Sequence, residues 1–151
     1  MRLLIDYQQG EVISEMATCF TGLRRIFPTL TAPSFALSLK RCWRILEGQV
    51  TKGFILERKP EERFREYGST ELMIAIHPEH RRQGIATRAL NQLVNKLDNA
   101  FLLVSPGNMT AFSLFSGIRG LAHVHDRPDA QVFIQRVNSG KSRCFVENLN
   151  Y

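Results

Sequence analysis

Small residues follow an apolar run near the middle of the chain, at a spacing that could hold a phosphate. The run Leu72–Ile76 ends at His77-Pro78, and the segment Arg81-Arg82-Gln83-Gly84-Ile85-Ala86 precedes a helical pattern. The first N–H groups of a helix have no partner within it, and small residues let a phosphate approach them. The segment therefore predicts a phosphate or pyrophosphate site. It is neither the dinucleotide fingerprint nor a P-loop, which is longer and ends in Lys-Ser/Thr.

The same segment resembles the acetyl-CoA loop of the Gcn5-related N-acetyltransferases (GNAT), written Arg/Gln-x-x-Gly-x-Gly/Ala after an apolar strand. Its surroundings agree, because Trp43–Leu56 resembles the second and third strands of the family and Phe101–Ser105 resembles the fifth. Asn108–Phe115 resembles the family helix Asn-x-x-Ala-x-x-Leu-Tyr. The resemblance implies an acetyl-CoA-dependent N-acetyltransferase. Such an enzyme moves an acetyl group from the thioester to an amine of a small molecule or protein by direct attack.

The resemblance also assigns the coenzyme contacts. The pyrophosphate would be held by main-chain N–H groups of Gln83, Gly84, Ile85, Ala86 and Thr87. Arg81, Arg82 or Arg88 could add charge at a phosphate. The backbone at Ile74 and Ile76 would pair with the pantetheine arm, Asn108 would hydrogen-bond it, and Phe115 would pack against its end. Two structural alternatives stay open: Gly84 and Ala86 as parts of a tight strand–helix turn only, and Asn108 as a helix cap only.

Transfer to an amine needs a base, and three residues are candidates for it: Glu71, His77 and His123. A catalytic Glu of some family members falls, by gapless counting, at Thr70, and neighbouring strand residues face opposite sides. His77 follows the same strand, while His123 shares one face of a later strand with His125. The alternatives are an exposed carboxylate, a loop residue, partly buried structural histidines, or a water chain without a single base. A main-chain N–H near Ile76 would polarise the carbonyl.

The chain differs from the family at the position of the general acid. The Tyr that often protonates the departing thiolate falls at Phe115, which has no proton to donate. Four residues could substitute, and the sequence selects none of them: Ser113, Ser116, Tyr7 and Tyr67. A second hypothesis is therefore a weakly catalytic or non-catalytic module that binds acyl-CoA or a protein on the same scaffold. A third is an acyltransferase for longer acyl groups.

Hydrophobic periodicity predicts the elements that would position these residues. In chain order they are strand Arg2–Asp6, helix Glu11–Phe27, helix Thr31–Lys40, the hairpin Cys42–Leu46 and Val50–Arg58, strand Thr70–His77, helix Ile85–Leu97, strand Phe101–Ser105, helix Asn108–Ser116, and strands Leu121–His125 and Gln131–Val137. The charged segment Lys59–Gly68 reads as a solvated loop. This is an α/β (α+β) pattern. The resemblance implies a mostly antiparallel twisted sheet of about seven strands, splayed between strands four and five, with about four helices on both faces.

Composition restricts the classes of function. A chain of 151 residues fits one domain, which we place at residues 1–137, with residues 138–151 as a tail. Three scattered cysteines indicate a reducing, cytoplasmic compartment and no metal site, and no apolar run could span a membrane. The net charge of +6 suits coenzyme phosphates, while scattered basic residues argue against nucleic acid. The sequence is compatible with a homodimer but does not select an oligomeric state.

Overall fold

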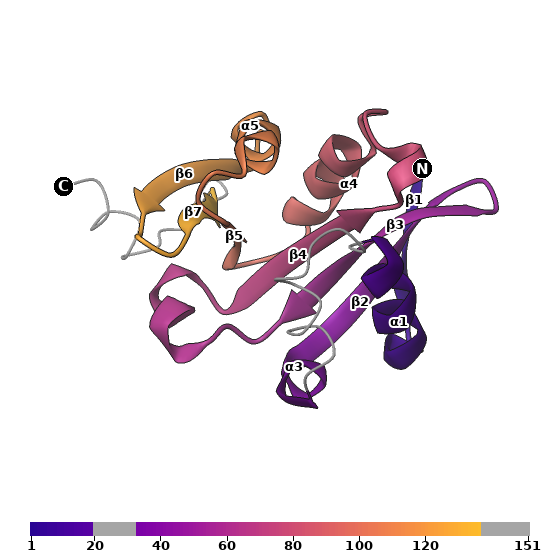
Figure 1. Cartoon of the computed structure of the whole chain (residues 1–151), viewed down its shortest axis with the longest axis horizontal. Coiled ribbons are helices and arrows are strands. Elements are labelled where there is room, and N and C mark those ends of the chain that lie inside the picture. The colour runs from indigo at the N-terminus through magenta and orange to yellow at the C-terminus, as the bar shows by residue number, and fades with distance from the viewer. Residues whose placement is uncertain (20–32, 137–151) are drawn as a thin grey trace. The chain divides into compact units, whose positions relative to one another are not determined.

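The strands form one mixed sheet in a computed structural model that describes residues 1–19 and 33–136. Seven strands follow the order β1-β2-β3-β4-β5-β7-β6 (Figure 1). The pairs β1–β2, β2–β3, β5–β7 and β6–β7 are antiparallel. This confirms the predicted fold class, an α/β chain with a mostly antiparallel seven-stranded sheet. The predicted opening of the sheet between Ile76 and Phe101 stays a prediction.

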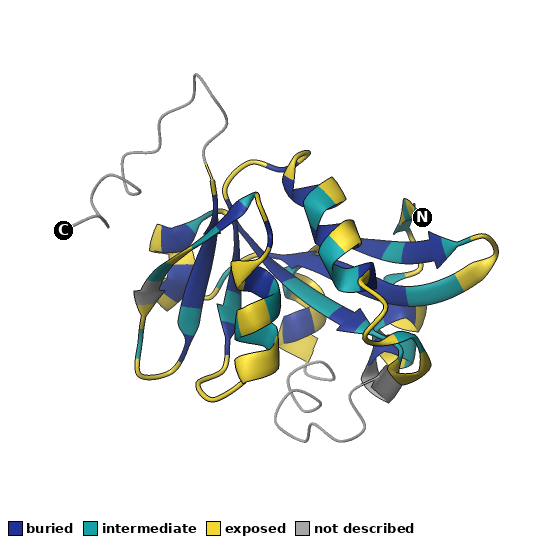
Figure 2. Ribbon diagram, turned by 90° about the horizontal axis from the view of Figure 1, so that it is seen from above, coloured by how far each residue is buried: buried dark blue, intermediate teal, exposed yellow. Residues whose placement is uncertain are grey.

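Two compact units share the chain. The first comprises Met1–Lys59 and Leu72–Ala89, and the second comprises Pro60–Glu71 and Leu90–Tyr151. In Figure 2 most strand residues are buried, whereas helices and turns carry exposed residues along one side. The prediction of one domain over residues 1–137 stays a prediction, and the predicted tail lies outside the described residues.

The first unit is built on an antiparallel meander. Strand β1 (Arg2–Asp6) pairs with β2 (Leu39–Glu47), which pairs with β3 (Val50–Arg58) through a turn with Gly48 at φ 60°. Helix α1 (Gln9–Cys19) and the short helix α3 (Pro33–Ser38) supply side chains to its core. The buried members of this core are Val12, Met16, Phe35, Cys42, Phe54, Leu56 and Ala75.

Several boundaries in this unit differ from the prediction, and strand β2 spans Leu39–Glu47 instead of Cys42–Leu46. The predicted helix Glu11–Phe27 starts earlier, at Gln9, and its part beyond Cys19 lies outside the described residues. The predicted helix ending near Lys40 stops at Ser38, because Leu39 already pairs with Arg58 in the hairpin. The Lys59 N–H donates to Ser38 O at 2.8 Å, which fixes this change from helix to strand.

The second unit carries the later strands. Strand β5 (Ala100–Val104) pairs with β7 (Gln131–Gln135), and β7 pairs with β6 (Leu121–Asp126). Helix α5 (Met109–Ser116) connects β5 to β6. A core cluster combines Phe101 with buried residues of the segment before β4, of β7 and of the position just before β7: Phe64, Tyr67, Ala130, Val132 and Ile134.

The charged segment Lys59–Gly68 is not the solvated loop that its composition predicts. It contains the 3₁₀-helix η1 (Glu62–Tyr67), in which Phe64 and Tyr67 are only 3% and 2% exposed. Residues three apart lie above one another in a 3₁₀-helix, so the two aromatic rings share one face. Their burial decides the structure of the segment, whereas its charged side chains remain at the surface.

The central strand and the following helix agree with the predicted order. Strand β4 spans Thr70–Ile76, the 3₁₀-turn η2 spans Pro78–His80, and helix α4 spans Ile85–Val94. The strand ends one residue earlier than predicted and the helix three residues earlier. Leu97 nevertheless remains buried, with 7% exposure.

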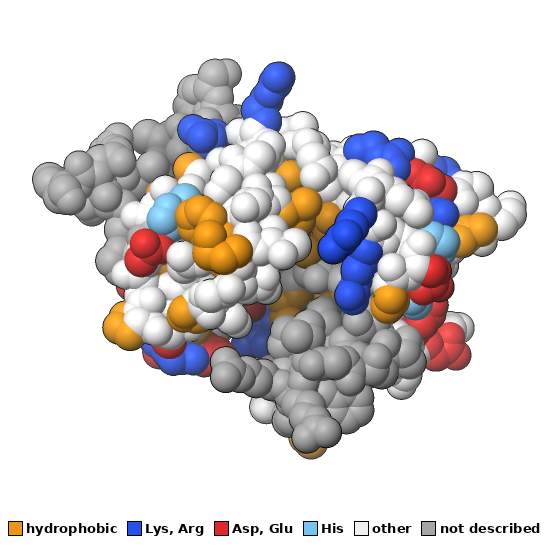
Figure 3. Space-filling model, turned by 45° about the horizontal axis from the view of Figure 1, so that its top comes forward, with side chains coloured by type: hydrophobic (Ala, Val, Ile, Leu, Met, Phe, Trp, Pro, Cys, Tyr) orange, Lys and Arg blue, Asp and Glu red, His pale blue; other side chains and the backbone are white. Residues whose placement is uncertain are grey.

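Charges on the surface are dispersed. The face in Figure 3 shows Lys and Arg side chains in several small groups, with Asp and Glu beside some of them. Six arginines of the described segments form ion pairs with carboxylates: Arg41, Arg44, Arg63, Arg65, Arg88 and Arg127. No described helix is long and apolar enough to cross a bilayer. Within residues 1–19 and 33–136, no group of three His, Cys, Asp or Glu residues is arranged to hold a metal ion.

Candidate active site

The loop before α4 has an unusual backbone. Arg82 adopts φ 62° and Gly84 adopts φ 72°, both in the left-handed region. A non-glycine residue there is uncommon, so the conformation of Arg82 marks a built turn. Turns of this kind gather successive N–H groups into a concavity that binds anions. A methyl group added at Gly84 would meet no heavy atom of the described chain within 4 Å, so the space over this backbone is open.

Helix α4 presents its first N–H groups at this loop. Its first internal hydrogen bond runs from the Arg88 N–H to Gly84 O at 3.1 Å. The amides of Ile85, Ala86 and Thr87 therefore precede the helical ladder. These amides form the positive end of the helix dipole, which stabilises a bound phosphate. The structure thus brings together the backbone groups that the sequence proposes for the pyrophosphate, including Gln83 in the exposed turn.

The three arginines near the loop are engaged differently. Arg81 Nε donates to Ile76 O at 3.1 Å, which fastens the loop to the end of β4. Arg88 Nη2 lies 2.7 Å from Glu47 Oε1 at the β2–β3 turn, although the Arg88 side chain is half exposed. The Arg82 side chain is exposed. Arg82 is therefore the residue whose charge is most available to a phosphate, whereas Arg81 and Arg88 also hold the loop in place.

The Arg81 contact bears on the proposed pantetheine pairing. The Ile76 carbonyl, one of two positions proposed for that pairing, already accepts a hydrogen bond from Arg81. Ile74 and Ile76 are both partly buried on β4. A carbonyl oxygen has two lone pairs, and the Arg81 contact occupies one of the two acceptor positions of Ile76 O.

His77, a candidate base, lies directly after β4 in the first unit. Its N–H donates to Lys52 O at 2.9 Å, and its ring packs edge-on against Phe54 with centroids 5.6 Å apart. His77 Nε2 lies 3.4 Å from Glu15 Oε1 on α1, and the His77 side chain is 16% exposed. The ring is therefore oriented by a carboxylate and an aromatic neighbour, unlike a freely moving loop histidine.

Glu15 belongs to a network that the sequence did not reveal. Arg44 Nη1 donates to Glu15 Oε2 at 3.1 Å, and Arg44 Nη2 lies 2.8 Å from Asp6 Oδ2. Burial opposes ionisation of Asp6, but hydrogen bonds from the Gln8 N–H and Arg44, with the Arg44 charge, bring the pKa of Asp6 below its ordinary value. Side chains from β1, α1 and β2 thus form one network with His77. Because these residues are far apart in the sequence, no local sequence pattern predicted the network.

Asn108 caps helix α5 in the second unit. Its Oδ1 accepts a hydrogen bond from the Ala111 N–H at 3.1 Å, as the structural alternative for this residue required. The two donors of the Asn108 amide group remain compatible with a ligand. Phe115 is 6% exposed and packs edge-on against Phe133, with centroids 5.7 Å apart. Its first role is therefore in the core of this unit.

His123 lies on β6 beside α5. Its ring contacts Phe112 and Phe133 at centroid distances of 5.0 and 5.2 Å, and its Nε2 lies 2.6 Å from Asp126 Oδ1. A register irregularity separates His123 from His125.

Glu71 is buried in the second unit, with 8% exposure, so it is not the exposed strand-end carboxylate of the structural alternative. It lies five positions before Ile76 on β4.

Comparison with known proteins identifies the family to which the chain belongs. The sequence model of the Acetyltransferase (GNAT) family matches residues 13–118, more than half of the chain. No curated protein matches the chain in sequence.

Solved structures show the same fold at low sequence identity. A chimera of the Vibrio cholerae spermidine N-acetyltransferase SpeG and hSSAT is 16% identical, with a TM-score of 0.61 over 89% of this chain and 96% of the other. An acetyltransferase from Thermus thermophilus is 17% identical, with a TM-score of 0.61 over 90% and 97%. YncA of Salmonella typhimurium, solved with acetyl-CoA, is 11% identical, with a TM-score of 0.55 over 95% and 99%. With the family match over residues 13–118, the chain belongs to the acetyltransferase (GNAT) family.

Proposed function

We propose that the protein is an acetyl-CoA-dependent N-acetyltransferase whose acceptor is an amine of a small molecule or protein. The observation that carries this proposal is the loop before α4. There, left-handed Arg82 and Gly84 lead into a helix whose first amides precede its own hydrogen-bond ladder. The family membership supports acetyl transfer, and a spermidine N-acetyltransferase is among the similar structures.

Backbone groups would carry most of the coenzyme binding. The amides from Gln83 to Thr87 would hold the pyrophosphate, and Arg82 would add charge. The backbone of β4 at Ile74 and Ile76, the Asn108 amide and the Phe115 ring are proposed for the pantetheine arm. Because backbone groups would make most of these contacts, substitutions that alter the loop backbone should affect binding most.

The reaction requires an unprotonated amine, a stabilised carbonyl oxygen and a departing thiolate. A main-chain N–H near Ile76 is proposed to stabilise the oxygen. We assign the base to His77, because it lies at the end of β4 beside the phosphate loop and its ring is oriented by Glu15 and Phe54. Glu71 is far along the strand, and His123 contacts Phe112, Phe133 and Asp126 instead.

A second candidate function rests on Phe115. A buried phenylalanine stands where the family often has the tyrosine that protonates the thiolate, which favours a weakly catalytic or non-catalytic acyl-CoA- or protein-binding module. Thiolates leave at neutral pH more readily than alkoxides do, so the missing tyrosine does not exclude turnover.

Thiol release separates the two functions. The full chain would be incubated with acetyl-CoA and a panel of polyamines, amino acids and lysine peptides, while free thiol is followed over many turnovers. Steady release that depends on one amine class supports the enzyme. Binding of acetyl-CoA without amine-dependent release supports the binding module. A preference for longer acyl-CoA would instead indicate a different acyl donor. A cytoplasmic location and a homodimer stay predictions.

A further inference from the structure

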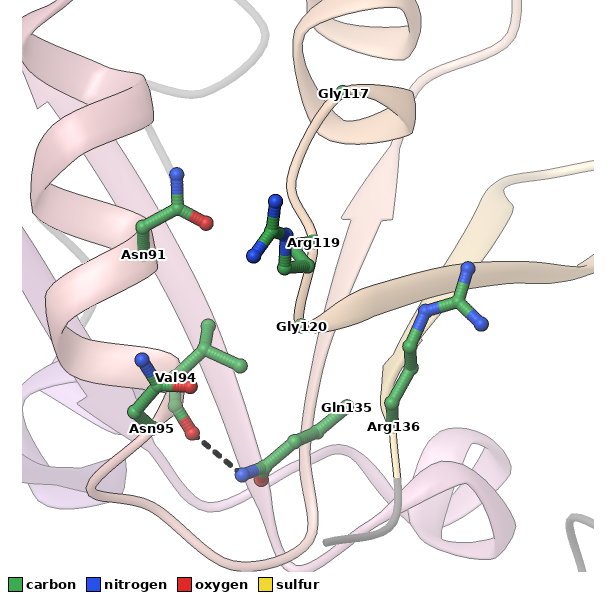
Figure 4. A pocket seen from close by; sticks show the side chains of 8 residues that line it. All are labelled: Asn91, Val94, Asn95, Gly117, Arg119, Gly120, Gln135 and Arg136. Atoms are coloured by element: carbon green, nitrogen blue, oxygen red, sulfur yellow. Dashed lines mark hydrogen bonds between the residues drawn. The ribbon is translucent and has the colours of Figure 1, made fainter.

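A pocket lies entirely within the second unit, at the C-terminal half of α4. Its walls come from α4, from the turn between α5 and β6, and from the end of β7 (Figure 4). Its volume is about 560 Å³, within the range of small-molecule sites. None of the residues proposed for acetyl-CoA or for catalysis lines it. The pocket is therefore a separate feature that the proposed function leaves unexplained.

The walls of the pocket are fixed by hydrogen bonds and close packing. The Gln135 amide donates to Val94 O at 2.6 Å and to Leu97 O, and accepts from the Ala100 N–H at 3.1 Å. A Cβ atom at Gly120 would lie 2.6 Å from Val94 Cγ1, so this close approach of turn and helix suits glycine. The Arg136 N–H donates to Gly120 O at 2.7 Å. The pocket is thus preformed.

Positive charge dominates the lining. Arg119 and Arg136 both contribute to it, and no Asp or Glu does. Neither guanidinium forms an ion pair with a carboxylate of the described segments, whereas Arg63 and Arg127 of the same unit both pair with Asp129. Arg136 Nε donates to Leu121 O at 3.2 Å, which holds this side chain at the rim. An arginine without a carboxylate partner at a preformed cavity favours an anionic ligand.

Capping of helix α5 does not account for Arg119. The carbonyls of Leu114 and Phe115 at the end of α5 already accept hydrogen bonds from the N–H groups of Gly117 and Ile118, each at 3.1 Å. Figure 4 shows the Arg119 guanidinium directed across the pocket toward the Asn91 carboxamide of α4. Asn95, the first residue after α4, also lines the pocket. Guanidinium donors and carboxamide groups therefore converge on one space.

We propose that this pocket binds a small organic anion through a carboxylate or phosphate group. Arg119 supplies two parallel donors to the anionic group, as guanidinium groups do for carboxylates and phosphates. Asn91 and Asn95 offer both donors and acceptors to the neutral part of the ligand. Arg136 raises the positive potential at the rim. This site is independent of the acetyl-CoA loop and of the proposed function.

The test is calorimetric titration of the full chain with citrate and, separately, with inorganic phosphate, at constant ionic strength. The variant Arg119→Gln removes the anchoring charge, and Arg65→Gln removes one exposed charge of the same unit as a matched control. We expect Arg119→Gln to weaken binding of the preferred anion about tenfold or more, since a hydrogen bond to a charged group is lost. Arg65→Gln should leave the affinity within about twofold.

The Gly84→Glu variant distinguishes this pocket from the phosphate loop. Anion binding that survives Gly84→Glu and is lost in Arg119→Gln supports the proposal, and the better probe identifies a carboxylate or a phosphate ligand. Equal affinities for Arg119→Gln and Arg65→Gln would overturn it. Absence of binding by both anions at tens of millimolar would overturn it as well. Resonances of the Asn91 and Asn95 side-chain amides in NMR spectra would report directly on occupancy.

Discussion

At the scale of single residues, the account depends on two side chains whose neighbours the sequence did not specify. His77 is oriented by Glu15 and Phe54, and Glu15 is in turn held by Arg44. Phe115 is buried against Phe133, where the family often has tyrosine. The first observation supports the proposal of His77 as the base among three candidates, and the second leaves no proton donor at the position of the usual acid. Each leads to a substitution with a defined kinetic result.

The His77→Gln substitution should lower turnover by about two orders of magnitude, because general-base catalysis typically contributes that much. KM for acetyl-CoA should stay unchanged. His80→Gln is the matched control, since His80 lies in the same loop and contacts Lys52 instead. Unchanged turnover in His77→Gln, or the same loss in Glu71→Gln or His123→Gln, would place the base elsewhere.

The Phe115→Tyr substitution tests the missing acid. A hydroxyl there should raise turnover severalfold if protonation of the thiolate limits the reaction. Because Phe115 is nearly buried, an unpaired hydroxyl would also cost about 1–3 kcal/mol of unfolding free energy. Turnover and urea unfolding would be measured on the same samples. A folded variant with unchanged turnover would show that another group supplies the proton, or that chemistry is not rate-limiting.

At the scale of elements, the sequence predicted the order of strands and helices better than their ends. Strands β3 and β4 and helices α4 and α5 fall where periodicity and the Asn108 cap place them. The prediction for Lys59–Gly68 was wrong, because the high charge of the segment concealed two aromatic residues at 3₁₀ spacing. Gln135 was missed for a related reason. The role of a lone amide in an apolar strand depends on backbone groups that are distant in the sequence, so no local pattern predicts it.

Gln135 joins three elements, and its replacement should reveal this. The Gln135→Leu variant keeps the size of the side chain but removes the partners of Val94 O, Leu97 O and the Ala100 N–H. We expect the free energy of unfolding to fall by about 2–5 kcal/mol. Gln131→Leu, at the partly exposed start of β7, should change it by about 0.5 kcal/mol. Similar urea midpoints for the two variants would contradict this role.

Cys42 on β2 gives the fold a dependence on alkaline pH. Burial, with smaller contributions from the negative charges of Asp6 and Glu57, raises the pKa of the thiol from 9.0 to about 11. The folded state therefore retains a proton that the unfolded state releases. The stability that this proton provides is complete below about pH 9 and is lost as the pH rises toward 11. The loss is at most about 1.4 kcal/mol per pH unit. The free energy of unfolding of Cys42→Ala should lack this decrease at alkaline pH. Parallel curves of unfolding free energy against pH for the two proteins would contradict the prediction.

At the scale of the whole molecule, family membership and fold support acetyl transfer, whereas the acceptor depends on residues that neither defines. On the face shown in Figure 3, Lys and Arg side chains of the described residues lie in several small groups, some of them beside Asp and Glu. The sequence predicted the phosphate loop because its chemistry is local, carried by a few small residues between a strand and a helix. The histidine network and the pocket of the second unit could not be predicted, since each assembles residues from three elements.

The central claim is that the loop before α4 binds the coenzyme, and calorimetric titration with acetyl-CoA tests it most directly. Gly84→Glu adds bulk and negative charge where the pyrophosphate would lie. Gly48→Glu is the control, because Gly48 also has a positive φ and open space around it. The account predicts saturable one-site binding that Gly48→Glu retains and Gly84→Glu loses while folded. Retained affinity in folded Gly84→Glu, or no binding by the unaltered chain at millimolar acetyl-CoA, would contradict it.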